Sequence, residues 1–136
     1  MKRFVLDNNV WVSVFYRSRA SSLIELVNED VIEIISCSEN LSEFIDIHTK
    51  HLRIKKMLPL ETDTYTAILK ETADFFEPQK RYALLPDYKD NYLIDLAHQT
   101  KAMLVTNDSH FTIARKLQRP AVKIITVQEF YKLVQL

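Results

Sequence analysis

The chain has 136 residues and a mass of 16.0 kDa, which fits a single domain (1–136) with a core that needs no disulfide or metal for stability. Its composition, 47% hydrophobic and 26% charged, is that of an ordinary globular protein, and one cysteine excludes a disulfide framework or a cysteine-rich zinc site. Eighteen basic residues balance eighteen acidic ones, which excludes a uniformly basic surface but allows a local basic patch.

Two absences narrow the class of protein further. No apolar run approaches the roughly 18 residues of a membrane span, and no signal-peptide pattern opens the chain, so we expect a cytoplasmic protein with no membrane partner. The chain has no glycine, which excludes glycine-rich phosphate loops and dinucleotide fingerprints. Left-handed turn positions are therefore expected to fall to Asn and Asp.

Short apolar runs alternate with longer amphipathic segments along the chain. The runs predict strands at residues 3–6, 31–36, 102–106 and 122–126. Helical patterns lie at about 10–17, 22–29, 37–52, 62–76, 91–101, 109–117 and 127–136, while 81–85 fits either an edge strand or an extended connector. Three S/T-x-x-E sequences predict helix starts, at Ser22, Ser36 and Thr126.

Strands that alternate with helices require crossover connections, which favours a parallel sheet covered on both faces. The predicted fold class is α/β, a three-layer α/β/α arrangement with a central, mainly parallel sheet.

Four acidic residues fall near one edge of this predicted sheet. Asp7 directly follows the first strand, and Asp108 lies two residues past the third. Glu43 lies about two turns into the helix after the second strand, and Asp90 opens the helix that leads into the third. Ligands of open parallel sheets bind outside the carboxyl ends of the strands, so these carboxylates can converge.

A convergent acidic cluster repels itself, and a hard divalent cation such as Mg²⁺ or Mn²⁺ removes that repulsion. Each acid also has an ordinary structural role: Asp7 in a turn, Glu43 on a solvated face, and Asp90 and Asp108 at helix starts. Their joint placement favours a metal site over four separate structural roles.

The segments that carry these acids resemble the motifs of PIN domains. Residues 6–10, LDNNV, are similar to the opening LDTNV of that family, and residues 41–44 to its second acidic helix. Residues 87–97 resemble the segment DPxDNxxLxLA, and residues 105–111 resemble VTGDxHL. The resemblance implies a metal-dependent ribonuclease fold whose members include toxins of bacterial and archaeal toxin–antitoxin pairs (VapC-like). Its acidic quartet maps onto Asp7, Glu43, Asp90 and Asp108.

Two positions depart from the family pattern without removing a carboxylate. Asn8 stands where Thr or Ser is usual, which alters a hydrogen bond near Asp7. Asn107 stands where Gly is expected before Asp108, and it is tolerable there in a left-handed conformation.

The chemistry assigns a role to each polar residue near the predicted edge. Asp7 and Asp108 are the expected direct metal ligands, while Glu43 and Asp90 bind through water, bridge a second ion or orient the nucleophile. Asn9 is expected to hold Asp7 in its rotamer. Thr106 either contacts substrate or a carboxylate or merely favours the strand, and His110 has a minor role in the site. Asp46 and Asp95 are expected on solvated surfaces.

An RNA substrate needs cations near the acids. The densest basic run is residues 51–57, and the scattered further candidates are Arg17, Arg19, Arg115, Lys116 and Arg119. A net charge of zero predicts weak affinity for RNA that depends strongly on salt. The aromatic residues Trp11, Phe15 and Tyr16 either pack in the core or line a groove for a partner or a second copy.

These features predict an Mg²⁺- or Mn²⁺-dependent endoribonuclease, the toxin of a toxin–antitoxin pair, bound by a small protein antitoxin and able to form a homodimer. The alternative is a PIN-like module that binds RNA or protein and cleaves weakly. A phosphatase is disfavoured because it requires a second Asp two residues after Asp7, where Asn9 stands. A receiver-type domain is disfavoured because its adjacent acids and late-strand Lys are absent from the sequence.

Overall fold

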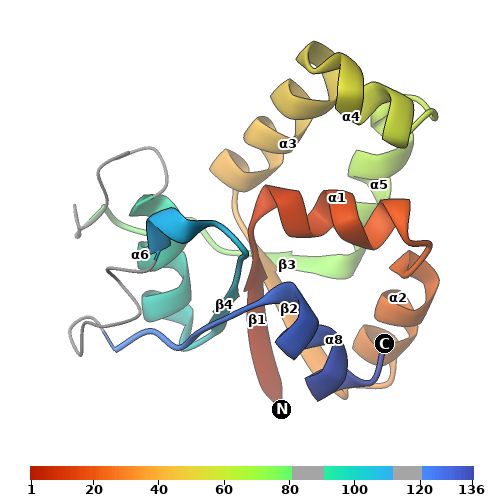
Figure 1. Cartoon of the computed structure of the whole chain (residues 1–136). Helices are drawn as coiled ribbons and strands as arrows, with labels where there is room; N and C mark the ends of the chain where they lie inside the picture. Colours follow the sequence, from red (N-terminus) through yellow and green to blue (C-terminus); the bar gives the residue numbers. More distant parts are fainter. Residues whose placement is uncertain (81–90, 112–120) are drawn as a thin grey trace.

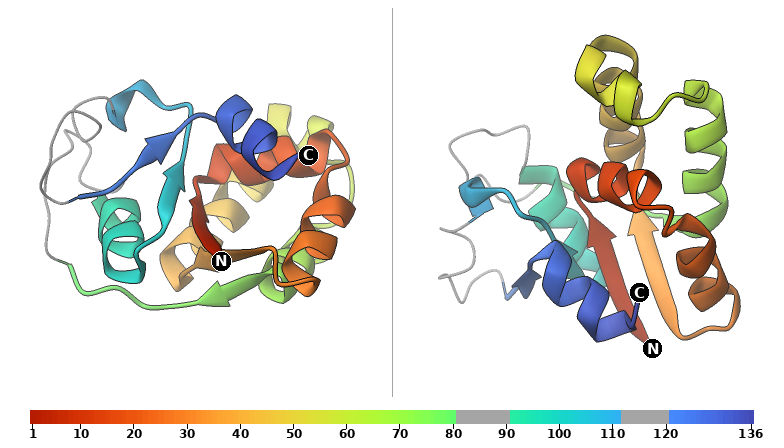
Figure 2. Two further views of the ribbon diagram at one scale, coloured as in Figure 1. Left: turned by 90° about the horizontal axis from the view of Figure 1, so that it is seen from below. Right: turned by 45° about the vertical axis from the view of Figure 1, so that its right-hand side comes forward.

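The computed structural model describes residues 1–80, 91–111 and 121–136, which form a parallel sheet covered by helices (Figures 1 and 2). The strands, all parallel in the order β3-β2-β1-β4-β5, are β1 (Lys2–Leu6), β2 (Ile32–Ser36), β3 (Ala73–Phe75), β4 (Met103–Val105) and β5 (Ile124–Ile125). The helices are α1 (Asn8–Tyr16), α2 (Ala20–Asn28), α3 (Ser38–Lys50), α4 (Leu52–Met57), α5 (Thr62–Thr72), α6 (Asn91–Thr100) and α8 (Val127–Val134), and a 3₁₀ turn, η2 (Ser109–Phe111), follows β4.

The sheet separates two hydrophobic cores, because successive side chains of a strand point to opposite faces. On β1, Phe4 and Leu6 join the core that α1, α2 and α8 cover, whereas Val5 joins the core that α6 covers. Figure 1 shows α6 on one side of β1 and the other three helices on the opposite side. The predicted three-layer α/β/α class is confirmed.

The strand order reverses at β1, and this reversal positions the polar edge of the molecule. The chain adds β2 and β3 on one side of β1 and then crosses to place β4 and β5 on the other. The last residue of β1, Leu6, lies opposite the last residue of β4, Val105. The residues that follow them therefore emerge side by side at a topological switch point.

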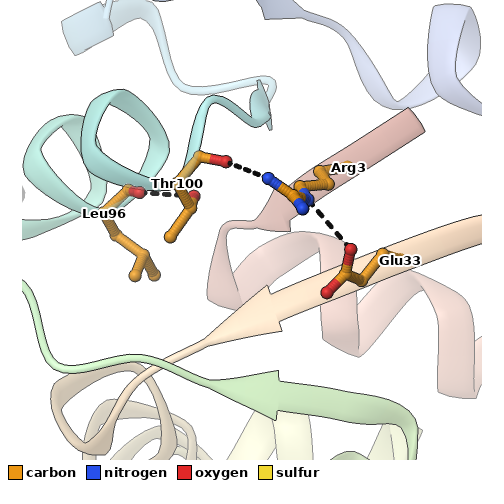
Figure 3. Close-up of polar contacts among 4 residues, drawn as sticks. All are labelled: Arg3, Glu33, Leu96 and Thr100. Atoms are coloured by element: carbon orange, nitrogen blue, oxygen red, sulfur yellow. Dashed lines mark hydrogen bonds and ion pairs between the residues drawn. The ribbon is translucent and has the colours of Figure 1, made fainter. Parts of the chain in front are cut away.

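A polar contact at the other end of the sheet joins three elements (Figure 3). Arg3 on β1 pairs with Glu33 on β2 at 2.9 Å, and its Nη1 donates to the carbonyl of Thr100 at the end of α6 at 3.2 Å. Arg3 and Glu33 are neighbours in the strand register, so the ion pair follows directly from the pairing of β1 with β2. Arg3 is 47% exposed, which limits the pair to a small contribution to stability.

Two of the predicted helices end earlier than the sequence pattern indicates. The helix predicted over 62–76 ends at Thr72, because residues 73–75 pair with β2 as the edge strand β3. The helix predicted over 37–52 ends at Lys50, and an extended His51 separates it from α4. Of the helix predicted over 109–117, the structure describes a 3₁₀ turn at its start. Residues 112–117 and the ambiguous segment 81–85 lie outside the described residues.

One of the three predicted helix starts is correct. Thr126 accepts from the backbone of Glu129, and the Glu129 carboxylate accepts from the backbone of Thr126, so both halves of the capping box form at α8. Ser22 instead lies inside α2, and Ser36 ends β2, one residue before the N-cap of α3. The S/T-x-x-E motif alone therefore does not distinguish a helix N-cap from other positions.

Among the residues that the structure describes, four non-glycine residues occupy the left-handed region, each just after a helix. They are Ser18, Asp30, Lys101 and Gln135. In each case the next residue donates its backbone N–H to a carbonyl in the last turn, as in the bond from Ala102 to Ala97 at 2.9 Å. The expectation that Asn and Asp would fill such positions is correct for Asp30 and wrong for the other three.

Replacing Lys101 with Gly should stabilise the protein, because a left-handed residue with a Cβ carries roughly 1 kcal/mol of strain that Gly does not. We expect Lys101→Gly to raise the free energy of unfolding by about 1 kcal/mol, measured by urea denaturation. The control is Lys132→Gly at an exposed position of α8, which should lower it by about 1 kcal/mol. Equal destabilisation by both substitutions would contradict the prediction.

Candidate active site

Asp7 is fixed at the switch point by its own backbone. Its N–H donates to the carbonyl of Val105 at 3.1 Å, which extends the pairing of β1 with β4 by one bond. Its carbonyl accepts from the N–H of Val10 at 2.8 Å and so begins α1. One residue therefore ends a strand and opens a helix, and its partly buried side chain lies at the carboxyl edge of the sheet.

Thr106 links the carboxylate of Asp7 to the backbone of Asp108, the two residues that the sequence assigns to direct metal binding. Its Oγ1 donates to Oδ2 of Asp7 at 2.7 Å and accepts from the backbone N–H of Asp108 at 3.0 Å. Thr106 is 4% exposed and follows directly after β4, so its position is set by the sheet. Of the two roles left open for Thr106, the structure supports contact with a carboxylate.

Asp108 lies beside Asp7 and holds the turn that follows it. Its Oδ1 accepts from the backbone N–H of His110 at 2.9 Å, and Nδ1 of the exposed His110 lies 3.4 Å from the same oxygen. The Asp108 side chain is 30% exposed, so part of it faces solvent.

Burial raises the pKa of Asp7 above its ordinary value of 3.8, and the charge of Asp108 raises it further. The hydrogen bond from Thr106 and the backbone amides of Asn8 and Asn9 act in the opposite direction, but burial outweighs them. Ionised Asp7 is therefore electrostatically unfavourable in the fold and would be stabilised by a cation.

Glu43 enters the same edge from α3 and is held by a polar network. Its Oε2 accepts from Nδ2 of Asn8 and from Oη of Tyr92, both at 3.0 Å. Asn40 donates to Oδ1 of Asn8 at 3.2 Å and accepts from Oγ of Ser36 at 2.6 Å. Asn8, Asn40 and Ser36 are at most 2% exposed, so this network ties the half-buried Glu43 to buried residues.

Tyr92 remains a hydrogen-bond donor in this network. Burial raises the pKa of its phenol strongly, and the neighbouring charge of Glu43 adds to the rise. The phenol therefore stays protonated near neutral pH and donates to the Glu43 carboxylate.

The sequence did not identify the residues that orient Glu43. Asn8 was noted only as a departure from the family pattern, yet it joins the chain beside Asp7 to Glu43. Asn107, the second departure, is not left-handed; its Oδ1 accepts from the backbone N–H of Val127 at 3.0 Å and ties this turn to α8. Only the position of Tyr92 inside the matched segment 87–97 could have drawn attention to it.

Several other predicted positions differ from expectation. The side chain of Asn9 is exposed, and its backbone amide, not its side chain, acts on Asp7. Asp95 is 2% exposed, so the prediction of a solvated residue was wrong, while Asp46 is exposed and pairs with Lys50. Asp90 lies outside the described residues.

The carboxylates suit a hard divalent cation in their chemistry. Within residues 1–80, 91–111 and 121–136, no three acidic, histidine or cysteine side chains approach closely enough to hold a metal together. Thr106 nevertheless joins Asp7 to the backbone of Asp108 at one edge, and Mg²⁺ commonly uses one or two carboxylates together with waters and phosphate oxygens. The oxygen donors and the unfavourable burial of Asp7 fit such an ion.

Residues 3–110 match a family model described as PIN domain. This chain belongs to the PIN domain family. PIN domains are generally nucleases and typically use divalent metals, which agrees with an acidic edge at the switch point. A search of curated proteins finds no significant match to the chain. Among the described helices of this PIN domain, none is both long and apolar enough to cross a membrane.

Removing the charge of Asp7 should stabilise the fold when metal is chelated. Because the folded-state pKa of Asp7 is raised, its ionisation opposes folding above that pKa and has no effect below the ordinary value of 3.8. Asp7→Asn should therefore raise the melting temperature in chelator near pH 7, and the gain should disappear near pH 3.

The control for this measurement is Asp46→Asn, the same change at an exposed acid of α3. This control loses the ion pair to Lys50, so its free energy of unfolding should fall by only a few tenths of a kcal/mol. If Asp7→Asn lowered the melting temperature sharply near pH 7, Asp7 would instead be a structural residue that its hydrogen bonds stabilise.

Proposed function

We propose that this PIN domain is a metal-dependent endoribonuclease that hydrolyses RNA phosphodiester bonds. The observation that carries the proposal is the hydroxyl of Thr106, which joins Asp7 to the turn of Asp108 at the switch point of the sheet. Burial makes the charge of Asp7 unfavourable for the fold, whereas hydrolysis of phosphodiesters needs anionic oxygens around a cation.

Asp7 and Asp108 would hold Mg²⁺ or Mn²⁺, with Glu43 and Asp90 contacting the ion through water, sharing a second ion or orienting the attacking water. When bound, such an ion supplies charge neutralisation at the scissile phosphate and a more acidic water. Asp90 enters the proposal through the family motif alone.

The chain itself would preorganise these carboxylates before substrate binds. Thr106 fixes one oxygen of Asp7, so the carboxylate does not have to reorient during the reaction. Asn8 and Tyr92 both bind Oε2 of Glu43 and set the direction of that carboxylate. Partners of this kind typically change metal affinity or activity by about 10- to 100-fold when they are removed.

For the biological role, we propose a VapC-like toxin that a small protein antitoxin neutralises, acting on RNA in the cytoplasm. The family resemblance of the four motifs supports this role, and a free thiol at Cys37 is compatible with a reducing compartment. Self-association as a homodimer and a single domain over residues 1–136 belong to the same proposal.

The purified chain should cut single-stranded RNA only with Mg²⁺ or Mn²⁺ present. Unstacked RNA presents its backbone to an open edge more readily than a duplex does. Asp7→Asn should lower the cleavage rate at least about a hundredfold, because it removes a charge that would hold the ion and adds almost no volume. Asp46→Asn should cut like the wild type. Cleavage would be followed with a labelled RNA pool on a denaturing gel.

Calorimetric titration with Mn²⁺ tests whether a variant that no longer cuts RNA has lost its metal ion. Wild type should bind the ion and gain thermal stability with its concentration, and the Asp7→Asn/Asp108→Asn variant should not. Equal cleavage by wild type and Asp7→Asn would indicate a contaminating nuclease. RNA binding without cleavage by the wild type, in any metal, would favour the non-cleaving PIN-like module.

Expression of the chain in bacteria should test the toxin role. Induction of the wild type should arrest growth, because cleavage of cellular RNA stops translation, and induction of Asp7→Asn should not. Co-expression of a short reading frame that neighbours the gene should restore growth if it encodes the antitoxin. Equal growth of cells that make either chain at equal levels would contradict the toxin role while leaving the activity in vitro to stand.

A further inference from the structure

Three adjoining hollows follow the exposed side of α1. The first two share Tyr16, Arg53 and Met57 as lining residues. The second and third share Asn9, Ser13 and Arg17. We call this continuous surface the α1 groove. Residues of α4 line the first two hollows and residues of α8 line the third, and Figure 1 shows helix α1 between α4 and α8.

The α1 groove begins at the acidic edge. Asn9, which lines two of its hollows, is two residues from Asp7, and Asn107, which lines the third, directly precedes Asp108. Asn9, Ser13 and Arg17 are spaced by four residues and so share one face of α1. At 1.5 Å per residue, Arg17 lies about 12 Å along the helix from Asn9.

The lining of the groove is positively charged in a chain whose net charge is zero. Its hollows are lined by the cations Arg17, Arg19, Arg53 and Lys56. No acidic residue of the described chain lines them. Within the same described residues, Arg17, Arg53 and Lys56 form no ion pair, while Arg19 lies 5.9 Å from the ring centre of Tyr131. Three cationic groups are therefore available to an anionic ligand.

An exposed aromatic ring stands among these cations. Tyr16 is 57% exposed and lines two of the hollows. Its neighbours differ: Trp11 is 1% exposed, and Phe15 packs against Phe44 and Tyr65. Of the two roles left open for these aromatic residues, Trp11 and Phe15 pack in the core, whereas Tyr16 lines the groove.

We infer that the α1 groove binds single-stranded RNA on one side of the bond to be cut. Single-strand sites combine cations along the backbone with aromatic rings on which bases stack, and the groove has both. The nearby carboxylates repel phosphates, so cations beside them are needed to hold the strand across the edge. The inference rests on the proposed nuclease function, to which it adds the path of the substrate.

Binding can be measured without cleavage. The probe is a labelled oligouridylate of about twelve nucleotides, followed by fluorescence anisotropy in chelator, with Asp7→Asn as the parent of every variant. The groove variant is Arg17→Gln/Arg53→Gln. Its matched control is Lys2→Gln/Lys70→Gln, which removes two exposed cations that line none of the three hollows. All variants change exposed side chains, and equal melting temperatures verify their folds.

The groove variant should bind RNA about tenfold or more weakly near 50 mM salt, and the slope of log affinity against log salt should fall by about 1.4. The control should retain the affinity and slope of the parent. Tyr16→Leu should weaken binding at least about fivefold with an unchanged slope, while Tyr16→Phe should bind like the parent, because stacking needs the ring and not the hydroxyl.

Equal affinities and slopes of the groove and control variants would overturn the inference, and so would a parent that binds no RNA. Binding of an oligoglutamate peptide without RNA would assign the groove to an acidic polypeptide instead. The assay is independent of the reaction. A wild type that never cuts RNA therefore contradicts the proposed function. An RNA affinity that is the same in the groove variant and in its parent contradicts only this inference.

Discussion

The pairing of β1 with β4 is the constraint on which the rest of the candidate site depends. Because Leu6 lies opposite Val105, the residues that follow them meet at one point of the sheet edge. The backbone fixes both: the N–H of Asp7 donates to Val105, and the N–H of Thr106 donates to Ile125 on β5. The short bond between Thr106 and Asp7 is thus a consequence of strand register, and a shift of one residue would abolish it.

The burial of Asp7 lowers the stability of the fold, although the same burial favours the binding of a cation. Burial of Asp7 beside another carboxylate disfavours the charged form, while the apolar side chains of β1 on both faces of the sheet favour the fold. Functional sites commonly retain such local conflicts, since a group that is already satisfied within the protein gains little from a ligand. The polar network around Glu43 differs, because its buried members are hydrogen-bonded to each other. Asn40 donates to Asn8, and Asn8 in turn donates to the Glu43 carboxylate.

The sequence was most informative where a signal is local. Apolar runs predicted four of the strands, and the position of Asp7 and Asp108 after strands predicted their common edge. The edge strand β3 could not be predicted, because residues 73–75 continue a helical pattern and become extended only by pairing with β2. The partners of Glu43 were missed for the same reason: Asn8 and Tyr92 lie 35 and 49 residues away along the chain, and no local pattern specifies those bonds.

Helix α1 connects these separate features in one rigid element. Its first turn is held by the carbonyl of Asp7, and its buried side chains, Val10, Trp11 and Val14, pack into the larger core. The opposite side of the same helix supplies Asn9 and Ser13 to the groove, and Arg17, the residue that caps its C-terminus, lines the groove beyond them. Because a helix transmits position along its axis with little freedom, the core packing that fixes Asp7 also fixes the spacing between the carboxylates and the cations. Cations on a mobile loop would neutralise phosphates equally well, but they would not hold a strand at a constant distance from the acids. That constancy is what positions one phosphodiester bond for attack.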